Sequence, residues 1–319
     1  MFGEFLDEVS GIVPDVLIIA GNHDSGASLG YCDGLLERSG VHIAGRFGGG
    51  MERVTVGDTD FWLLPFFRVS EVRAIADVPI DTYADAMAWI LGRADIDPSR
   101  ANVLVAHQFF IGRTPPETSD SEDQVPDVGG LSYIPADMLD AFDYVALGHL
   151  HSPQKVGRET LRYCGTPLKY SFSEAGQCKS ATFVELGAKG EVHITTAPLT
   201  PRHELRGLRG SYTELTDRRC YEGTAVDDYL YITLTDEQDV PDALARLRVI
   251  YPNLMQLDYD NQRTRQQQEI SAPERTESIS PLEHLAAFYQ LQNNQPLTAE
   301  QTAFCQELIE EIWKEGDTV

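Results

Sequence analysis

The chain has 319 residues, 42% of them hydrophobic, and a formal net charge of −25 at neutral pH. This length accommodates one large domain together with smaller ones, and no apolar run approaches the length of a membrane span. The five cysteines are scattered without a Cys-x-x-Cys pair. This pattern argues against a zinc ribbon or a disulfide framework and favours a cytoplasmic location.

A helix and a buried strand are the first elements that the sequence predicts. We expect residues 2–9 to be helical, and residues 16–20 form an apolar run that is typical of a buried strand. This run passes directly into Gly21-Asn22-His23-Asp24. A second helix is predicted at residues 83–94, where apolar residues recur at helical spacing.

Two later apolar runs end in histidine. Residues 103–106 run into His107, and residues 144–147 run into Gly148-His149-Leu150-His151. Ligands of open α/β sheets bind just beyond the carboxyl ends of such strands, so we expect the three runs to bring their polar residues to one place. If residues 148–151 are extended, both histidines lie on one side of the strand and Leu150 points into the core.

The residue types at these strand ends favour a metal site. Imidazole nitrogens combined with amide or carboxylate oxygens suit manganese, iron or zinc. Each motif alone has a simpler interpretation, because Gly, Asn and Asp are ordinary turn residues and a lone histidine after a strand is more often structural. Three such motifs, each at a strand end, favour the functional interpretation.

Residues 113–130, which follow His107, are rich in proline and acidic residues and predict a long exposed loop. This loop either borders the active site or is a surface excursion. Residues 181–186 and 192–196 alternate in polarity on either side of a glycine-flanked turn, which predicts a β-hairpin.

A smaller unit is predicted after Pro198. Residues 229–234 and 253–259 have the composition of strands, and residues 241–251 have a helical apolar face, so we expect a strand–helix–strand module. A protein that contacts DNA phosphates needs basic residues. The densest basic stretch either lines a DNA path or belongs to a solvated surface, and the net charge of the chain does not distinguish these alternatives. That stretch contains Arg202, Arg206, Arg209, Arg218 and Arg219.

The C-terminal region has clear helix-start signals. Residues 262–278 are polar and rich in glutamine, as linkers are. Capping-box sequences at residues 280–283 and 298–301 then open two short amphipathic helices. Such helices cannot bury their apolar faces well alone, so we expect them to pack either on the main domain or on another protein.

The order of Gly21-Asn22-His23-Asp24, His107 and Gly148-His149-Leu150-His151 resembles that of the calcineurin-like metallophosphoesterases. Residues 144–174 and 280–315 are more similar to one branch of this superfamily, the SbcD nuclease subunits. The resemblance covers essentially the whole chain.

The resemblance implies an α/β fold. A metallophosphoesterase-type layered sandwich, with two mixed sheets flanked by helices, would occupy residues 1–198. A small α+β capping domain at residues 199–265 would help to hold DNA. A linker at residues 266–279 would lead to a two-helix tail at residues 280–319, which would bind the ATPase SbcC.

The same resemblance assigns roles to individual residues. Asn22, His107 and His149 would bind one metal ion, and His151 would bind the other. His23 would stabilise charge on the scissile phosphate or protonate the leaving oxygen, and Asp24 would accept a hydrogen bond from it. The family uses two manganese ions, with magnesium as a substitute. Arg202, Arg206 and Arg209 are the candidate DNA contacts.

Two ligand motifs of the family, a strand ending in Asp-x-His and a second strand ending in Gly-Asp, are not found upstream of Asn22. We therefore expect the first strands of the sandwich to be missing, whether through a mis-assigned start, a broken gene or a fragment. The remaining ligands are neutral and do not offset the charge of two dications, so we expect at most one weakly bound ion and little or no nuclease activity.

The function implied is that of a metal-dependent 3′–5′ DNA exonuclease and endonuclease in DNA repair, recombination and replication. Its partners would be DNA and SbcC, with two copies of the nuclease subunit in a heterotetramer and no membrane association. One alternative is a non-catalytic remnant that binds SbcC or DNA. Another is a phosphodiesterase of small molecules, which the predicted cap and tail disfavour.

Overall fold

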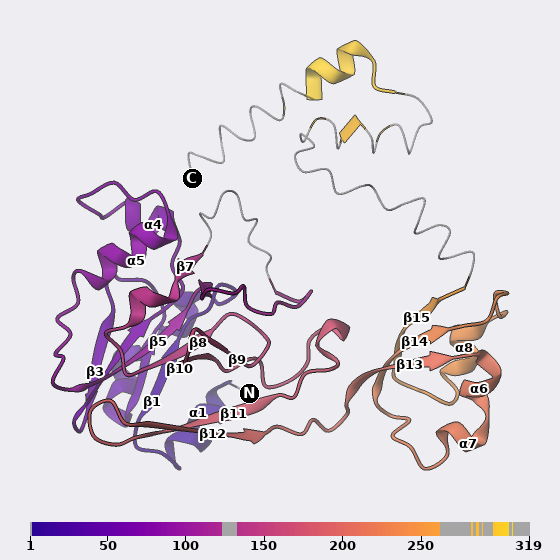
Figure 1. Cartoon of the computed structure of the whole chain (residues 1–319), viewed down its shortest axis with the longest axis horizontal. Helices are drawn as coiled ribbons and strands as arrows, with labels where there is room; N and C mark the ends of the chain where they lie inside the picture. The colour runs from indigo at the N-terminus through magenta and orange to yellow at the C-terminus, as the bar shows by residue number, and fades with distance from the viewer. Residues whose placement is uncertain are drawn as a thin grey trace. The chain divides into compact units, whose positions relative to one another are not determined.

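The computed structural model describes residues 2–122, 133–261, 282, 285–286, 289, 296–305 and 308. The chain divides into two compact units, Met1–Leu234 with Val240–Asp258 and Thr235–Asp239 with Tyr259–Val319. Helices and several sheets occur together in the first unit (Figure 1), which confirms the mixed α/β class. Among the described residues, no helix is long and apolar enough to cross a membrane.

A six-stranded sheet is the centre of the first unit, with the strand order β3-β4-β5-β8-β10-β9. Its four inner strands run parallel to one another. Each of the two edge strands is antiparallel to the inner strand beside it. The strands are β3 (Glu52–Val56), β4 (Thr59–Leu64), β5 (Ala101–His107), β8 (Tyr144–Gly148), β9 (Gln154–Val156) and β10 (Arg158–Tyr163). The predicted runs at residues 103–106 and 144–147 are therefore adjacent central strands.

The main core lies where α5 (Tyr83–Leu91) packs against this sheet. Met87 and Ile90 of the helix are fully buried, as are Leu104 of β5 and Val145 of β8. The helix begins with a reciprocal capping box at Thr82. It ends three residues before the predicted residue 94, because Gly92 follows its last turn.

The predicted strand at residues 16–20 is β1 (Val16–Ile19), which pairs in parallel with β2 (Val41–Ala44). The first predicted helix is confirmed as α1 (Phe2–Ser10). Its Leu6 packs in a small apolar cluster with residues of β2. The Phe66 amide, just after β4, donates to the Ala20 carbonyl at 2.9 Å. This bond ties the end of β1 to the end of β4. The shorter helices nearby are α2 (Gly26–Leu29), α3 (Asp33–Leu36) and α4 (Val69–Arg73).

The predicted hairpin is confirmed as β11 (Ser180–Leu186) and β12 (Val192–Pro198). A three-stranded sheet follows, in which the predicted strands are β14 (Tyr229–Leu234) and β15 (Leu254–Tyr259). The prediction missed β13 (Leu205–Gly210), and the predicted helix is only five residues long, α8 (Ala243–Leu247). The remaining short elements are α6 (Tyr212–Thr216), α7 (Arg218–Tyr221), β6 (Phe110–Ile111) and β7 (Ile134–Pro135).

The tail is described only in part. At the second predicted capping box, the Gln301 amide donates to the Thr298 hydroxyl at 3.3 Å and the Thr298 amide donates to the Gln301 side chain at 2.9 Å. This reciprocal pair confirms the helix start at residues 298–301. The predicted linker at residues 266–279 lies outside the described residues, as do Ser280 and Pro281 of the first capping box.

Candidate metal and phosphoester site

The ends of β1, β5 and β8 bring three of the predicted ligands together. Strands β5 and β8 are parallel neighbours, with His107 opposite Gly148. The Asn22 side-chain oxygen, in the turn after β1, lies 3.0 Å from Nε2 of His107. The rings of His107 and His149 meet edge to face with their centroids 5.4 Å apart. The prediction that these strand ends converge is therefore supported by the geometry.

Two glycines lie close to the imidazole of His107. A Cβ atom at Gly21 would lie 2.7 Å from Cε1 of His107, and one at Gly148 would lie 2.7 Å from its Nδ1. Only glycine leaves room for the ring at both positions. Burial and the neighbouring His149 lower the pKa of His107 to about 4, against the opposing effect of Asp24. The ring is therefore neutral at pH 7, the form that binds metal.

Gly148→Ala is expected to lower the free energy of unfolding by about 1–3 kcal/mol, the usual cost of overpacking a well-filled site. The added methyl group would lie 2.7 Å from Nδ1 of His107, so the His107 ring or the backbone at Gly148 would have to shift. Urea unfolding of the metal-free chain measures the change. Gly176→Ala is the control, because no atom lies within 4 Å of a Cβ at Gly176. Equal stability of Gly148→Ala and wild type would contradict the crowding.

The condition that residues 148–151 are extended is not met at His149. Its φ angle is +109°, a value that non-glycine residues rarely adopt and that costs of order 1–3 kcal/mol. The chain turns at the point where β8 ends. Leu150 is nevertheless buried, as predicted. Such strain is concentrated at functional sites.

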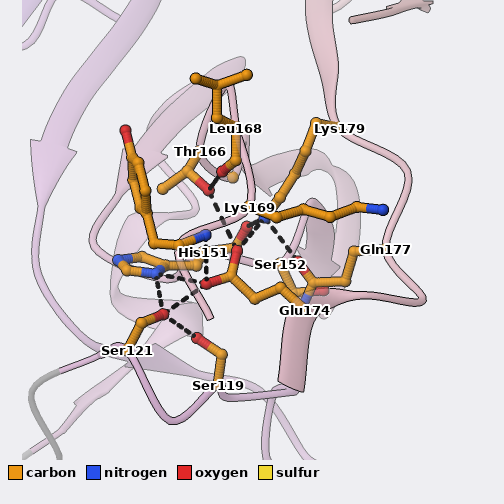
Figure 2. A network of polar contacts seen from close by, with 12 residues as sticks. Ser119, Ser121, His151, Ser152, Thr166, Leu168, Lys169, Glu174, Gln177 and Lys179 are labelled. Carbon is orange, nitrogen blue, oxygen red and sulfur yellow. Dashed lines mark hydrogen bonds and ion pairs between the residues drawn. The ribbon is translucent and has the colours of Figure 1, made fainter. Parts of the chain in front are cut away.

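His151 lies in a polar network that the sequence did not predict (Figure 2). Its Nδ1 is 2.7 Å from the Ser121 hydroxyl and 3.3 Å from Oε1 of Glu174. Its backbone amide donates to Glu122 at 2.5 Å, and its carbonyl accepts from Lys179 at 2.7 Å. Ser121 and Glu122 belong to the loop after His107, so the described part of this loop lies beside His151. Of the two alternatives for residues 113–130, these contacts favour the one in which the loop borders the site.

Glu174 is the buried anion of this network. Its side chain is completely inaccessible to solvent and forms an ion pair with Lys179 at 2.6 Å. Burial alone would raise the pKa of Glu174, but hydrogen bonds from Lys179, Ser121 and His151 outweigh it and hold the pKa at about 2. The sequence offers one signal for this network, which is that the oppositely charged residues Glu174 and Lys179 lie only five positions apart.

The other predicted residues are exposed or half-buried. His23 and Asp24 are exposed in the turn after β1, where the Asp24 carboxylate accepts a hydrogen bond from the Gly21 amide at 2.7 Å. The predicted bond from His23 to Asp24 stays a prediction. Arg202 and Arg209 are exposed, whereas Arg206 is paired with Asp228 at 2.7 Å. Their contact with DNA also stays a prediction.

The ligand set suits one ion better than two. Asn22, His107 and His149 offer one amide oxygen and two imidazole nitrogens at one place, a combination that fits a borderline divalent cation. His151 is the single predicted ligand for a second ion. In the ranges that the structure describes, no group of three or more His, Cys, Asp or Glu residues could hold a metal. The number of ions that this centre binds stays a prediction.

Comparison with known proteins finds a matching family model and matching curated relatives. Residues 201–293 match the SbcD C-terminal family model, described as the type 5 capsule protein repressor C-terminal domain. The chain is also 30% identical over 245 residues to the SbcD subunit of the nuclease SbcCD from Staphylococcus epidermidis (strain ATCC 12228 / FDA PCI 1200). The aligned region makes up 76% of this chain and 64% of that relative.

Proposed function

Because the chain is an SbcD-type protein, we propose that it acts as the nuclease subunit of an SbcCD-type complex and hydrolyses phosphodiester bonds in DNA with the help of metal ions. The expected reactions are 3′–5′ exonuclease and endonuclease cleavage in DNA repair, recombination and replication, in the cytoplasm. The chain spans 64% of the length of the Staphylococcus epidermidis relative. The nuclease activity of a whole SbcD protein is therefore proposed for this chain.

The convergence of Asn22, His107 and His149 at three strand ends is the observation that best supports the proposal. The 3.0 Å contact between Asn22 and His107 brings together residues that are 85 positions apart in sequence. An amide oxygen beside a neutral imidazole nitrogen is a typical pair of ligands for Mn²⁺. The metallophosphoesterase sandwich is the fold that we propose around this site.

When bound, a metal ion in such a site polarises a phosphoryl oxygen and lowers the pKa of water. The chain itself supplies the ligands and their orientation. Gly21 and Gly148 fix the plane of His107, and the turn after β1 exposes His23 next to Asn22. We propose that His23 donates a proton to the leaving oxygen or stabilises charge on the phosphate.

The capping region and the tail are the proposed partner sites. We propose that residues 199–265 help to hold DNA, with Arg202 and Arg209 as exposed candidate contacts. Residues 280–319 would bind SbcC, and two copies of the chain would share one complex. A non-catalytic subunit is the second candidate function, because His151 is the single predicted ligand for a second ion.

Calorimetric titration of the chelator-treated chain with Mn²⁺ tests the metal site. We expect one weak site, with at least tenfold weaker binding in His107→Ala. His42→Ala is the control, because His42 lies on β2 and faces Asp15 at 3.7 Å. Wild-type binding that His107→Ala leaves intact would overturn the assignment.

Incubation of linear duplex DNA with the chain and Mn²⁺ tests catalysis. The proposed function predicts Mn²⁺-dependent cleavage that a chelator abolishes, whereas a complete lack of cleavage would favour the non-catalytic subunit. Hydrolysis of bis(p-nitrophenyl) phosphate without DNA binding would favour a phosphodiesterase of small molecules.

A further inference from the structure

Hydrogen bonds fix both the backbone and the ring of His151. Its amide donates to the Glu122 carboxylate, and its carbonyl accepts from the Lys179 ammonium group and, at 3.2 Å, from the Thr166 amide. Its Nδ1 faces the hydroxyl of Ser121. Within the described part of the chain, Nε2 is therefore the ring nitrogen of His151 that remains available for a ligand.

The direction of each hydrogen bond in this network can be deduced from Glu174. Its Oε2 is paired with Lys179 at 2.6 Å, so the carboxylate is ionised and can only accept. The Ser121 hydroxyl lies 2.5 Å from the other carboxylate oxygen and must therefore donate to it. Figure 2 shows Ser121 linked to both Glu174 and His151.

A hydroxyl has a single proton, so Ser121 cannot also donate to His151. The 2.7 Å contact between the Ser121 oxygen and Nδ1 is a hydrogen bond only if Nδ1 carries the proton. In the neutral ring, Nε2 then carries the lone pair. The buried Glu174–Lys179 pair thus determines the tautomer of His151 through the Ser121 hydroxyl. The direct contact of Glu174 with Nδ1, at 3.3 Å, is the longer of the two contacts that Nδ1 makes.

We propose that Glu174, held by Lys179 and acting through the hydroxyl of Ser121, is a positioning residue that fixes His151 as its Nδ1–H tautomer with the Nε2 lone pair facing the site. The proposal deepens the proposed function, on which the use of Nε2 as a metal ligand rests. The tautomer itself does not depend on that function. Hydrogen bonding of this kind typically changes metal affinity by about 10–100-fold when it is lost.

Ser121→Ala tests the proposal more cleanly than a change at Glu174, because it leaves the buried ion pair intact. The measurement is the ¹⁵N NMR spectrum of the metal-free 319-residue chain with labelled histidines, with His151 assigned by its loss in His151→Gln. We expect a protonated Nδ1 in wild type. In Ser121→Ala we expect conversion to the Nε2–H form or to a mixture of the two.

Two further variants separate the tautomer effect from loop docking. Ser121→Thr retains the hydroxyl and is expected to restore the wild-type spectrum. The Ser173 hydroxyl accepts from the amide of Asp120, which belongs to the same loop as Ser121, at 3.0 Å. Ser173→Ala therefore removes a bond that docks this loop but leaves the contact between Ser121 and His151 in place. It is expected to leave the tautomer unchanged. Protonation of Nε2 in wild type, or an unchanged tautomer in Ser121→Ala, overturns the proposal.

Addition of Mn²⁺ to the same sample separates this proposal from the proposed function. Paramagnetic broadening of the His151 Nε2 signal in wild type, at lower Mn²⁺ concentration than in Ser121→Ala, supports both. If Nδ1 is protonated in wild type but Mn²⁺ broadens no histidine signal, the positioning of His151 is supported and the metal-dependent function is wrong.

Discussion

Lys179→Met is expected to lower the free energy of unfolding by about 3–5 kcal/mol, because it leaves a buried carboxylate without its counter-charge. The side chains of Glu174 and Lys179 are 0% and 3% exposed, so water cannot replace the lost partner. Lys179 also donates to the His151 carbonyl and to Gln177. Equilibrium unfolding in urea, followed by circular dichroism at pH 7, measures the loss.

The chain provides a matched control on its surface. Lys155 and Glu159 also form an ion pair, but their side chains are 55% and 63% exposed. Lys155→Met is therefore expected to change stability by less than about 1 kcal/mol. Combining Lys179→Met with Glu174→Gln removes both charges and should restore part of the loss. A Lys179→Met variant as stable as Lys155→Met would show that the buried charge is not the source of the effect.

Acidification of the metal-free chain is expected to reduce its stability by up to about 3 kcal/mol between pH 6.5 and pH 4, from His107 alone. The pKa of His107 is about 4 in the folded chain and about 6.5 in an unfolded one. Between these values the unfolded state binds more protons. The free energy of unfolding therefore rises with pH through this window and is lost as the pH falls.

His107→Gln should remove this slope, because glutamine does not titrate. Glu174 contributes mainly at lower pH, since its pKa is lowered from 4.5 to about 2 and its stabilisation is lost only as the pH falls through that range. Urea unfolding at intervals from pH 7 to pH 4.5, with chelator present, separates the two groups. Parallel pH profiles for wild type and His107→Gln would contradict the assignment.

The strands that carry the site could be predicted because buried parallel strands are nearly continuous apolar runs. Each of the three runs became a strand within a few residues of its predicted bounds. Strand β13 was missed because Leu205-Arg206-Gly207-Leu208-Arg209-Gly210 contains glycine and arginine where strands usually have β-branched residues. The shortened α8 follows Asp242, whose left-handed conformation excludes it from the helix.

The network behind His151 could not be predicted from local patterns. Ser121 and Glu174 are 53 residues apart, and each looks like an ordinary polar residue of a loop in its own segment. Their contact depends on how the loop after β5 folds over the end of β8. The positive φ angle of His149 was missed for a similar reason, because alternation predicts faces of a strand and says nothing about where the strand stops.

The span of 85 residues between Asn22 and His107 has a consequence for folding kinetics. Closing a loop of this length costs conformational entropy. We therefore expect the contact between Asn22 and His107 to form late in folding. Metal bound there would slow unfolding and leave the folding rate largely unchanged. The rate at which Mn²⁺ binding appears during refolding would therefore report when β1 and β5 have come together.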